Sequence, residues 1–278
     1  MKKINRRSFL AAAGLTAAAL ALTACGGSAS STASSTASSA ASSEAASTSA
    51  AAELTTVEAG KLTMATNAAF PPYEMTTDAG EFEGIDIDTA KAIAEKLGLE
   101  LQIDDMDFDA ALLSVQQGKA DIVMAGVTVT DERKAVMDFS DSYATGIQSI
   151  IVPEGSDITS PDDLAGKKIG TQRGTTGYIY CSDDFGDDAV VAYDNGLTAV
   201  QALNNGQVDA VVIDNAPAKE FVAANPGLVI LETSYAEEDY AIGLAKGSSL
   251  EDAVNAALEE LKADGTLQSI VDKYITAE

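Results

Sequence analysis

Apolar and polar positions follow two alternating patterns from about residue 62 to residue 277. Short apolar or strictly alternating runs are typical of strands, and apolar positions spaced by three or four are typical of amphipathic helices. The runs predict strands at residues 61–66, 99–103, 122–125, 167–171 and 208–213. The spaced segments predict helices at residues 89–97, 110–117, 198–203 and 250–262, and a further helix that begins at Thr130. This alternation predicts an α/β protein with mainly parallel sheets.

Two of the predicted helices are bounded by residues that helix ends favour. Asp88 precedes the first of them and can cap its amino end, and Gly98 follows it. Either Asp107 or Asp109 can cap the second helix, which Gly118 follows. Short acidic side chains accept hydrogen bonds from the first free amides of a helix, and glycine adopts the left-handed conformation that ends one.

The folded part is long enough for two lobes of about 100 residues each. Residues 116–123 and 203–211 follow the same order of helix end, glycine, aspartate and apolar strand. Extended segments at residues 147–152 and 240–245 are candidates for two crossings between the lobes. We therefore predict one lobe from residues 59–146 together with 241–278, and a second lobe from residues 147–240.

The amino-terminal segment has the pattern of an export signal. A basic stretch is followed by an apolar core that is too short to span a membrane comfortably. Residues 1–24 are thus predicted to be a signal peptide. The pair Arg6-Arg7 resembles a twin-arginine signal, and the standard secretory route remains an equal alternative.

Cys25 follows directly after the small residues that end this apolar core, as in the bacterial lipobox, so it is predicted to carry a lipid. Of the 27 residues from 26 to 52, 24 are Ser, Thr or Ala, which leaves almost nothing to bury. We expect residues 25–58 to be the lipidated cysteine and a disordered tether, holding the protein on the outer face of the cell membrane.

Composition excludes several classes of function. The chain has 17 Lys and Arg against 43 Asp and Glu, no His and two Cys. Such a charge repels nucleic acid, and the missing histidines exclude Ser-His-Asp catalysis and His-ligated metals. The acidic run at residues 105–109 starts like a calcium loop, but Ala110 and Gln116 stand where such a loop needs Gly and Glu. We expect no metal and no cofactor.

A set of short motifs occurs in a fixed order along the chain. They are residues 65–74 (ATNAAFPPYE), 84–88 (GIDID), 125–134 (AGVTVTDERK), 138–140 (DFS), 174–177 (GTTG), 208–214 (VDAVVID) and 261–266 (LKADGT). Together they resemble the polar amino-acid-binding proteins of bacterial ABC importers, family 3 of the extracellular solute-binding proteins, in their lipoprotein form. The resemblance implies a periplasmic-binding-protein-like type II fold, in which a two-strand hinge joins two α/β lobes and a ligand cleft lies between them. It also implies a monomer that works with ABC permease and ATPase subunits and is not an enzyme.

The resemblance assigns the charged ends of an amino acid to particular residues. Arg133 offers a planar fork for the carboxylate, although the residue type alone favours a helix-surface role. Asp214, at the end of an apolar strand, is assigned to the ammonium, and a helix N-cap is an alternative that does not exclude this role. The further assigned residues are Gly126, with a backbone carbonyl for the ammonium, and Thr128, Thr175 and Thr176 with donors for the carboxylate.

Other positions match the part of the site that faces the ligand side chain. Phe70 and Phe108 would flank it, Ala125 would line it, and Asn67 and Gln172 would touch its far end. Asn67 stands where many relatives carry Asp, and Gln172 is uncharged where some carry Lys. Glu74 occurs in relatives of different specificity, so it does not indicate which amino acid is bound. We therefore expect a polar L-amino acid with an uncharged side chain, or a cystine-like ligand.

Two other functions are compatible with the same fold. A dehydratase that resembles the cyclohexadienyl type would need a general acid near the bound carboxylate, with Glu74 the nearest candidate. A ligand-sensing module would need a separate output partner. Cys181 is expected to lie at the surface or half-buried, and without a histidine partner it is a poor nucleophile.

Overall fold

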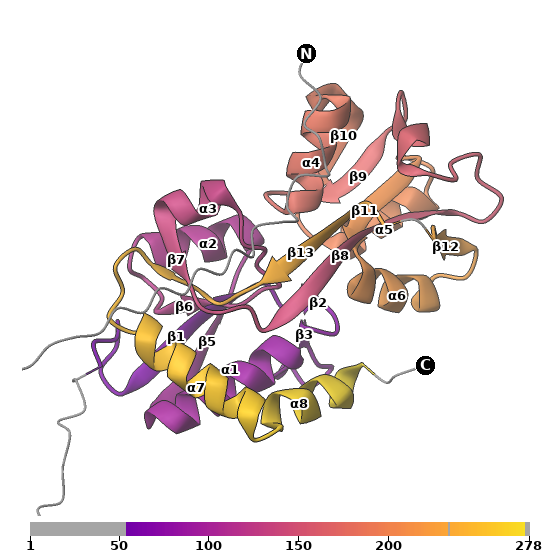
Figure 1. Ribbon diagram of the computed structural model, residues 1–278. Coiled ribbons are helices and arrows are strands. Elements are labelled where there is room, and N and C mark those ends of the chain that lie inside the picture. The colour runs from indigo at the N-terminus through magenta and orange to yellow at the C-terminus, as the bar shows by residue number, and fades with distance from the viewer. Residues whose placement is uncertain (1–53, 233, 276–278) are drawn as a thin grey trace, which may run out of the picture. The chain divides into compact units, whose positions relative to one another are not determined.

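The computed structural model describes residues 54–232 and 234–275, which belong to one compact unit (Figure 1). The predicted signal peptide, Cys25 and nearly all of the predicted tether lie outside these residues. No helix in the described ranges is long and apolar enough to cross a membrane.

The first of two large sheets has the strand order β5-β1-β6-β14-β7. Strands β5 and β6 are both parallel to β1, and β14 is antiparallel to β6 and β7. The strands are β1 Lys61–Thr66, β5 Glu100–Asp105, β6 Ile122–Val123, β7 Met137–Phe139 and β14 Gly243–Ala245. The helices that accompany them are α1 Ile85–Leu97, α2 Phe108–Gln116, α3 Asp131–Val136, α7 Glu251–Ala263 and α8 Thr266–Tyr274. A small sheet beside α1 contains β2 Ala69–Phe70, β3 Glu74–Thr76 and β4 Phe82–Glu83.

The second large sheet has the order β10-β9-β11-β8-β12, and β13 also pairs with β8. Its strands are β8 Ala144–Pro153, β9 Ile169–Gln172, β10 Val190–Tyr193, β11 Ala210–Asp214, β12 Leu228–Ile230 and β13 Ala236–Tyr240. The helices around it are α4 Thr176–Phe185, α5 Gly196–Asn204 and α6 Asn215–Ala224, with short 3₁₀ helices at Pro161–Leu164 and Asp187–Ala189. Strand β9 is parallel to β11 and to the edge strand β10, in agreement with the mainly parallel sheets that the sequence predicted.

Two antiparallel strands carry the chain from one sheet to the other and back. The chain leaves the first sheet after β7, enters the second along β8, and returns through β13 to β14. Strand β13 pairs with the first half of β8, from Ala144 opposite Tyr240 to Gln148 opposite Ala236. Helices α7 and α8, coloured yellow in Figure 1, then pack against α1 near the start of the chain. The first sheet is thus built from both ends of the described chain. The lobe boundaries at residues 147 and 240 stay predictions.

Glycine determines where α1 begins, four residues earlier than the sequence pattern predicted. The N-cap position is Gly84 and not Asp88, which lies inside the helix. A Cβ atom on Gly84, with φ at 133°, would collide with the Tyr73 carbonyl oxygen. The close approach lets Asp86 N–H donate to that oxygen over 2.9 Å. A segment distant in sequence therefore supplies the partner that we expected from a capping side chain, and it brings Asp86 into the interior.

Cys181 differs from its predicted exposure. It is fully buried in the apolar core beside the second sheet, with Ile169 and Val212 in the same cluster. Helix α4 packs on strands β9 and β11, and this packing turns the cysteine inward. The thiol is therefore a packing residue of that core.

We predict that Gly84→Ala destabilises the protein much more than Gly80→Ala. Both residues have positive φ, but a Cβ atom on Gly80 would meet nothing within 4 Å. The Gly84 variant combines backbone strain with a collision, for an expected loss of about 2–4 kcal/mol, against about 1 kcal/mol for the control. Urea unfolding of both variants measures the difference, and equal losses would contradict the role assigned to Gly84.

Candidate functional site

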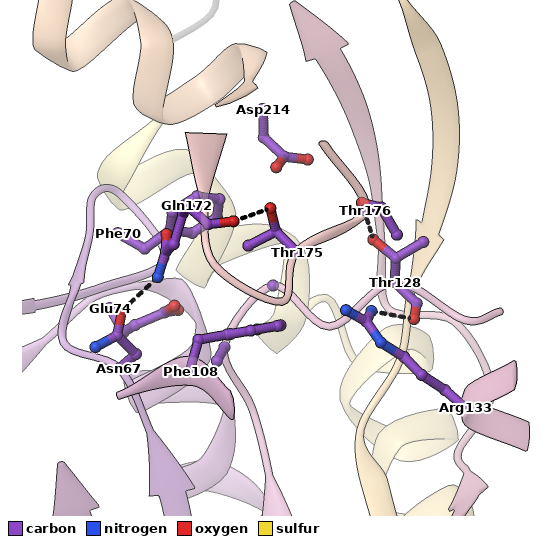
Figure 2. Close-up of a pocket in the computed structure, with 12 residues that line it drawn as sticks. Asn67, Phe70, Glu74, Phe108, Thr128, Arg133, Gln172, Thr175, Thr176 and Asp214 are labelled. Carbon is purple, nitrogen blue, oxygen red and sulfur yellow. Dashed lines mark hydrogen bonds between the residues drawn. The ribbon is translucent and has the colours of Figure 1, made fainter. Parts of the chain in front are cut away.

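One pocket brings together all eleven site residues predicted from the sequence (Figure 2). The part of the chain around the first sheet, including the small sheet, contributes Asn67, Phe70, Phe108, Ala125, Gly126, Thr128 and Arg133. The part around the second sheet contributes Gln172, Thr175, Thr176 and Asp214. Glu74 is a twelfth lining residue. Most of these residues follow the carboxyl ends of parallel strands, which is where open α/β sheets place their ligands.

Arg133 points into the pocket from the first turn of α3. Thr130 caps this helix, because its side chain accepts a hydrogen bond from the Arg133 amide. The guanidinium donates to the carbonyl oxygens of Thr128 at 2.7 Å and Gly174 at 3.2 Å, and it lies 5.4 Å from the centre of the Phe108 ring. Arg133 is only 8% exposed, so a helix-surface role is excluded. A guanidinium has five N–H donors, which leaves further donors for an anion.

Asp214 ends strand β11 and is 7% exposed. Its carboxylate accepts hydrogen bonds from the Tyr240 hydroxyl and, over 2.8 Å, from the Gln148 amide. It occupies the N-cap position of α6, as the sequence alternative had it, but its side chain makes no capping hydrogen bond. Burial, together with the nearby charge of Glu238, raises the pKa of Asp214 to about 7.

Glu238 organises the polar groups between the two sheets, and the sequence did not identify it. One carboxylate oxygen accepts hydrogen bonds from the hydroxyls of Thr128 and Thr176, both at 3.0 Å, and from Gln148 at 3.1 Å. Glu238 lies in an acidic run that is typical of solvent-exposed surface. The sequence pattern that could have identified it is the period-2 alternation of β13, in which Glu238 and Tyr240 share the buried face.

Asn67 and Gln172 face each other across the pocket. The Gln172 amide donates to the Asn67 side-chain oxygen over 2.9 Å, and the Asn67 amide donates to the carbonyl of Met106. Figure 2 shows this bond on the side of the pocket away from Arg133. The two amides therefore satisfy each other across the interface between the sheets.

Gly126 allows two groups to approach the pocket closely. Its φ is 55°, and a Cβ atom there would lie 2.8 Å from the ring of Phe70. Its amide donates to the Asp86 carboxylate over 3.0 Å.

The amino end of α4 lies at the pocket. Thr175 lines the pocket and caps this helix, because its side chain accepts a hydrogen bond from the amide of Tyr178.

Comparison with known proteins identifies the family. Residues 62–277 match the description "Bacterial extracellular solute-binding proteins, family 3". The chain belongs to this family. The probable histidine-binding protein of Neisseria gonorrhoeae is 32% identical over 283 residues, which is 99% of this chain and 98% of that protein. The L-cystine-binding protein TcyJ of Escherichia coli K12 is 32% identical over 226 residues, covering 80% and 85% of the two chains. The solved structure "An ancestral arginine-binding protein bound to glutamine" has 43% identity and a TM-score of 0.75, over 78% of this chain and 99% of that one.

These relatives confirm both the resemblance to amino-acid-binding proteins of ABC transporters and the predicted fold class of periplasmic-binding-protein-like type II. They are binding proteins rather than enzymes, and so is this chain. The dehydratase alternative has no support among them. Within the described ranges, no group of three or more acidic or cysteine side chains is arranged to hold a metal ion.

We predict that Asp214→Asn flattens the dependence of stability on pH. Because the pKa of Asp214 is raised to about 7, the folded protein binds a proton that the unfolded chain has released above about pH 4. The free energy of unfolding should therefore fall as pH rises from 4 to 7, by about 1.4 kcal/mol per unit of pKa difference.

Urea unfolding at several pH values, with no amino acid added, tests this prediction. The pKa of Asp86 is also raised, to about 6. Asp86 is present in both the wild type and the Asp214→Asn variant, so the difference between their stability profiles reports on Asp214. Identical pH profiles for the two proteins would show that the pKa of Asp214 is not raised by folding.

Proposed function

We propose that this protein is the substrate receptor of an amino-acid ABC importer, which captures a polar L-amino acid between two lobes and delivers it to a permease. The observation that carries the proposal is the burial of Arg133 and Asp214 in one pocket. Every α-amino acid brings a carboxylate and an ammonium group, and burying both requires a partner for each. A guanidinium and a carboxylate are the matching pair.

Each of the two ends has the chemistry it needs. At the carboxylate end, the remaining N–H groups of Arg133 are joined by the amino end of α4. The hydroxyl of Thr128 already donates to Glu238 and supports the pocket from behind. At the ammonium end, the Asp214 carboxylate is oriented by Tyr240 and Gln148. An ammonium beside Asp214 favours its ionised form and opposes the effect of burial. The relatives compared above are named for binding histidine, cystine and arginine, and all three are amino acids.

Hydrogen bonds between the two lobes support a closed form. Gln172 donates a hydrogen bond to Asn67, and Arg133 donates one to the Gly174 carbonyl, and in each case the two residues belong to different lobes. A ligand held by Arg133 on one side and Asp214 on the other adds contacts that exist only when the lobes are together, so its binding favours closure. The paired strands β8 and β13 are the hinge in this proposal.

The amino-terminal signal and Cys25 complete the proposal. A lipid on Cys25 and a tether of about 30 residues would hold the receptor at the outer face of the cell membrane, within reach of its permease and ATPase subunits. At about 5–6 Å times the square root of its length, the tether gives a mean reach of roughly 30 Å.

We predict that Arg133→Ala abolishes measurable amino-acid binding while the protein remains folded. Removing one partner of a buried charge pair costs about 3–5 kcal/mol, which corresponds to a loss of affinity of at least about 100-fold. The matched control is Arg173→Ala, because the Arg173 side chain is 55% exposed and does not line the pocket. Calorimetry with the common polar amino acids measures both variants. Unchanged affinity in Arg133→Ala would overturn the assigned role.

We predict that Cys25→Ser releases the protein from the membrane. Without the thiol no lipid can be attached, and the wild-type protein should sediment with membranes while the variant appears in the medium. Mass spectrometry of the amino-terminal peptide should show a lipid-sized addition on Cys25 in the wild type alone. A wild-type protein that is itself found in the medium would disprove the anchor.

A further inference from the structure

Two buried acids form a hydrogen-bonded pair at one wall of the pocket. Glu74 on β3 and Asp86 in the first turn of α1 are both 0% exposed. Glu74 lines the pocket (Figure 2), and its carboxyl group is hydrogen-bonded to that of Asp86. A carboxylate has no hydrogen to donate, so this bond requires one of the two groups to carry a proton.

The surroundings of the pair place the proton on Glu74. One oxygen of Asp86 accepts a hydrogen bond from the Tyr143 hydroxyl at 2.7 Å, and the other accepts one from the Gly126 amide at 3.0 Å. The amino end of α1 also favours a negative charge on Asp86. No amide or hydroxyl in the described ranges donates to either oxygen of Glu74. Donors stabilise the ionised form of an acid, so Asp86 is the carboxylate and Glu74 the neutral partner.

Neighbouring acids oppose a second negative charge on the pair. Burial, followed by the charge of Asp86, raises the pKa of Glu74 well above its usual range. The other titratable groups that face the pair are Asp105 at the end of β5, Asp214 at the end of β11, and the phenols of Tyr73 and Tyr143. The two carboxyl groups therefore hold one proton and one negative charge at neutral pH.

The ionised member of the pair holds a part of the pocket wall. Gly126 lines the pocket, and the sequence assigns its carbonyl to the ammonium group of the ligand. The amide that donates to Asp86 belongs to the peptide that precedes the Gly126 Cα atom. Glycine turns easily about this atom, and here it has a φ of 55°. Fixing the preceding peptide therefore limits the directions in which the Gly126 carbonyl can point.

We propose that Asp86 is a positioning residue for the ammonium end of the pocket, which holds the Gly126 peptide in place by means of the proton that it shares with Glu74. This inference rests on the proposed function. Without the shared proton, two adjacent buried carboxylates would repel each other, and Asp86 would move away from Gly126. Every amino acid brings the same ammonium group, so the effect is independent of the ligand side chain.

The first test is calorimetry of the full-length protein with L-arginine, L-histidine and L-glutamine. Their desamino analogues, which carry hydrogen in place of the ammonium group, are measured by competition. We expect Asp86→Asn to weaken each amino acid that binds the wild type by about 10- to 100-fold, and the desamino analogues by less than about threefold. The matched control is Asp88→Asn on the same helix, because Asp88 bonds to Lys273 and Tyr274 and does not line the pocket. It should bind as the wild type does.

Nuclear magnetic resonance tests the pair in the wild type without a substitution. The carboxyl carbon of Glu74 should titrate well above the range of an ordinary glutamate. In Asp86→Asn the pKa of Glu74 should be lower, because the neighbouring carboxylate is gone. The amide proton of Gly126 should shift upfield as Asp86 takes up a proton below about pH 6, since its acceptor then loses its charge.

Each part of the inference has an outcome that overturns it. The positioning role fails if Asp86→Asn binds amino acids as the wild type does, or if amino acids and desamino analogues are weakened by the same factor, as in a general loss of structure. If Asp86→Asn does not fold, a Gly126 amide signal that ignores the titration of Asp86 in the wild type overturns the role instead. The shared proton is disproved if Glu74 titrates as an ordinary glutamate. If no amino acid binds the wild type, the proposed function fails, and the carbon titration still decides the shared proton.

Discussion

The buried guanidinium of Arg133 is the constraint on which the site depends. A charge removed from water needs local partners, and this one is held by two backbone carbonyls from different sheets, those of Thr128 and Gly174. Gly174 itself is placed by close contact, because a Cβ atom on it would collide with the Asp109 carboxylate of α2. The same cation thus joins the segment before α3 to the loop after β9.

Glu238 extends this constraint to the connecting strands. It lies on β13, next to the point where the chain returns to the first sheet, and it binds hydroxyls that belong to both sides of the pocket. The Tyr240 hydroxyl, two residues further along the same face, donates to Asp214. A change in the pairing of β8 and β13 would therefore displace Glu238 and Tyr240 together. Side chains of the two connecting strands thus hold Thr128, Thr176 and Asp214, which line the pocket, so ligand contacts and the geometry of these strands are linked.

Sequence patterns predicted those parts of the molecule that depend on local periodicity. The apolar strands and the glycine after α1 were identified correctly, because alternation and left-handed glycine are local properties. The start of α1 was not, since its partner is the backbone at Tyr73. The pocket residues came from a family resemblance, and the sequence patterns did not reveal the residues that support them. Glu238, Gln148 and Tyr240 act through side chains on β8 and β13, which meet each other and Asp214 only after the second sheet has formed. Periodicity can place such residues on a buried face, but it cannot say what they meet there.

The acids of the pocket suggest how a strongly acidic protein can bind an ion pair without relying on its net charge of −26. Exposed charges are screened within about 8–10 Å, so the surface contributes little inside the pocket. What matters there is that burial raises the pKa of both Asp214 and Glu74, which favours protonated forms when no cation is near. An ammonium at Asp214 would take the place of a proton. Binding would then exchange a proton for a ligand charge at a fixed position relative to Arg133, so the pocket need never hold several uncompensated carboxylates.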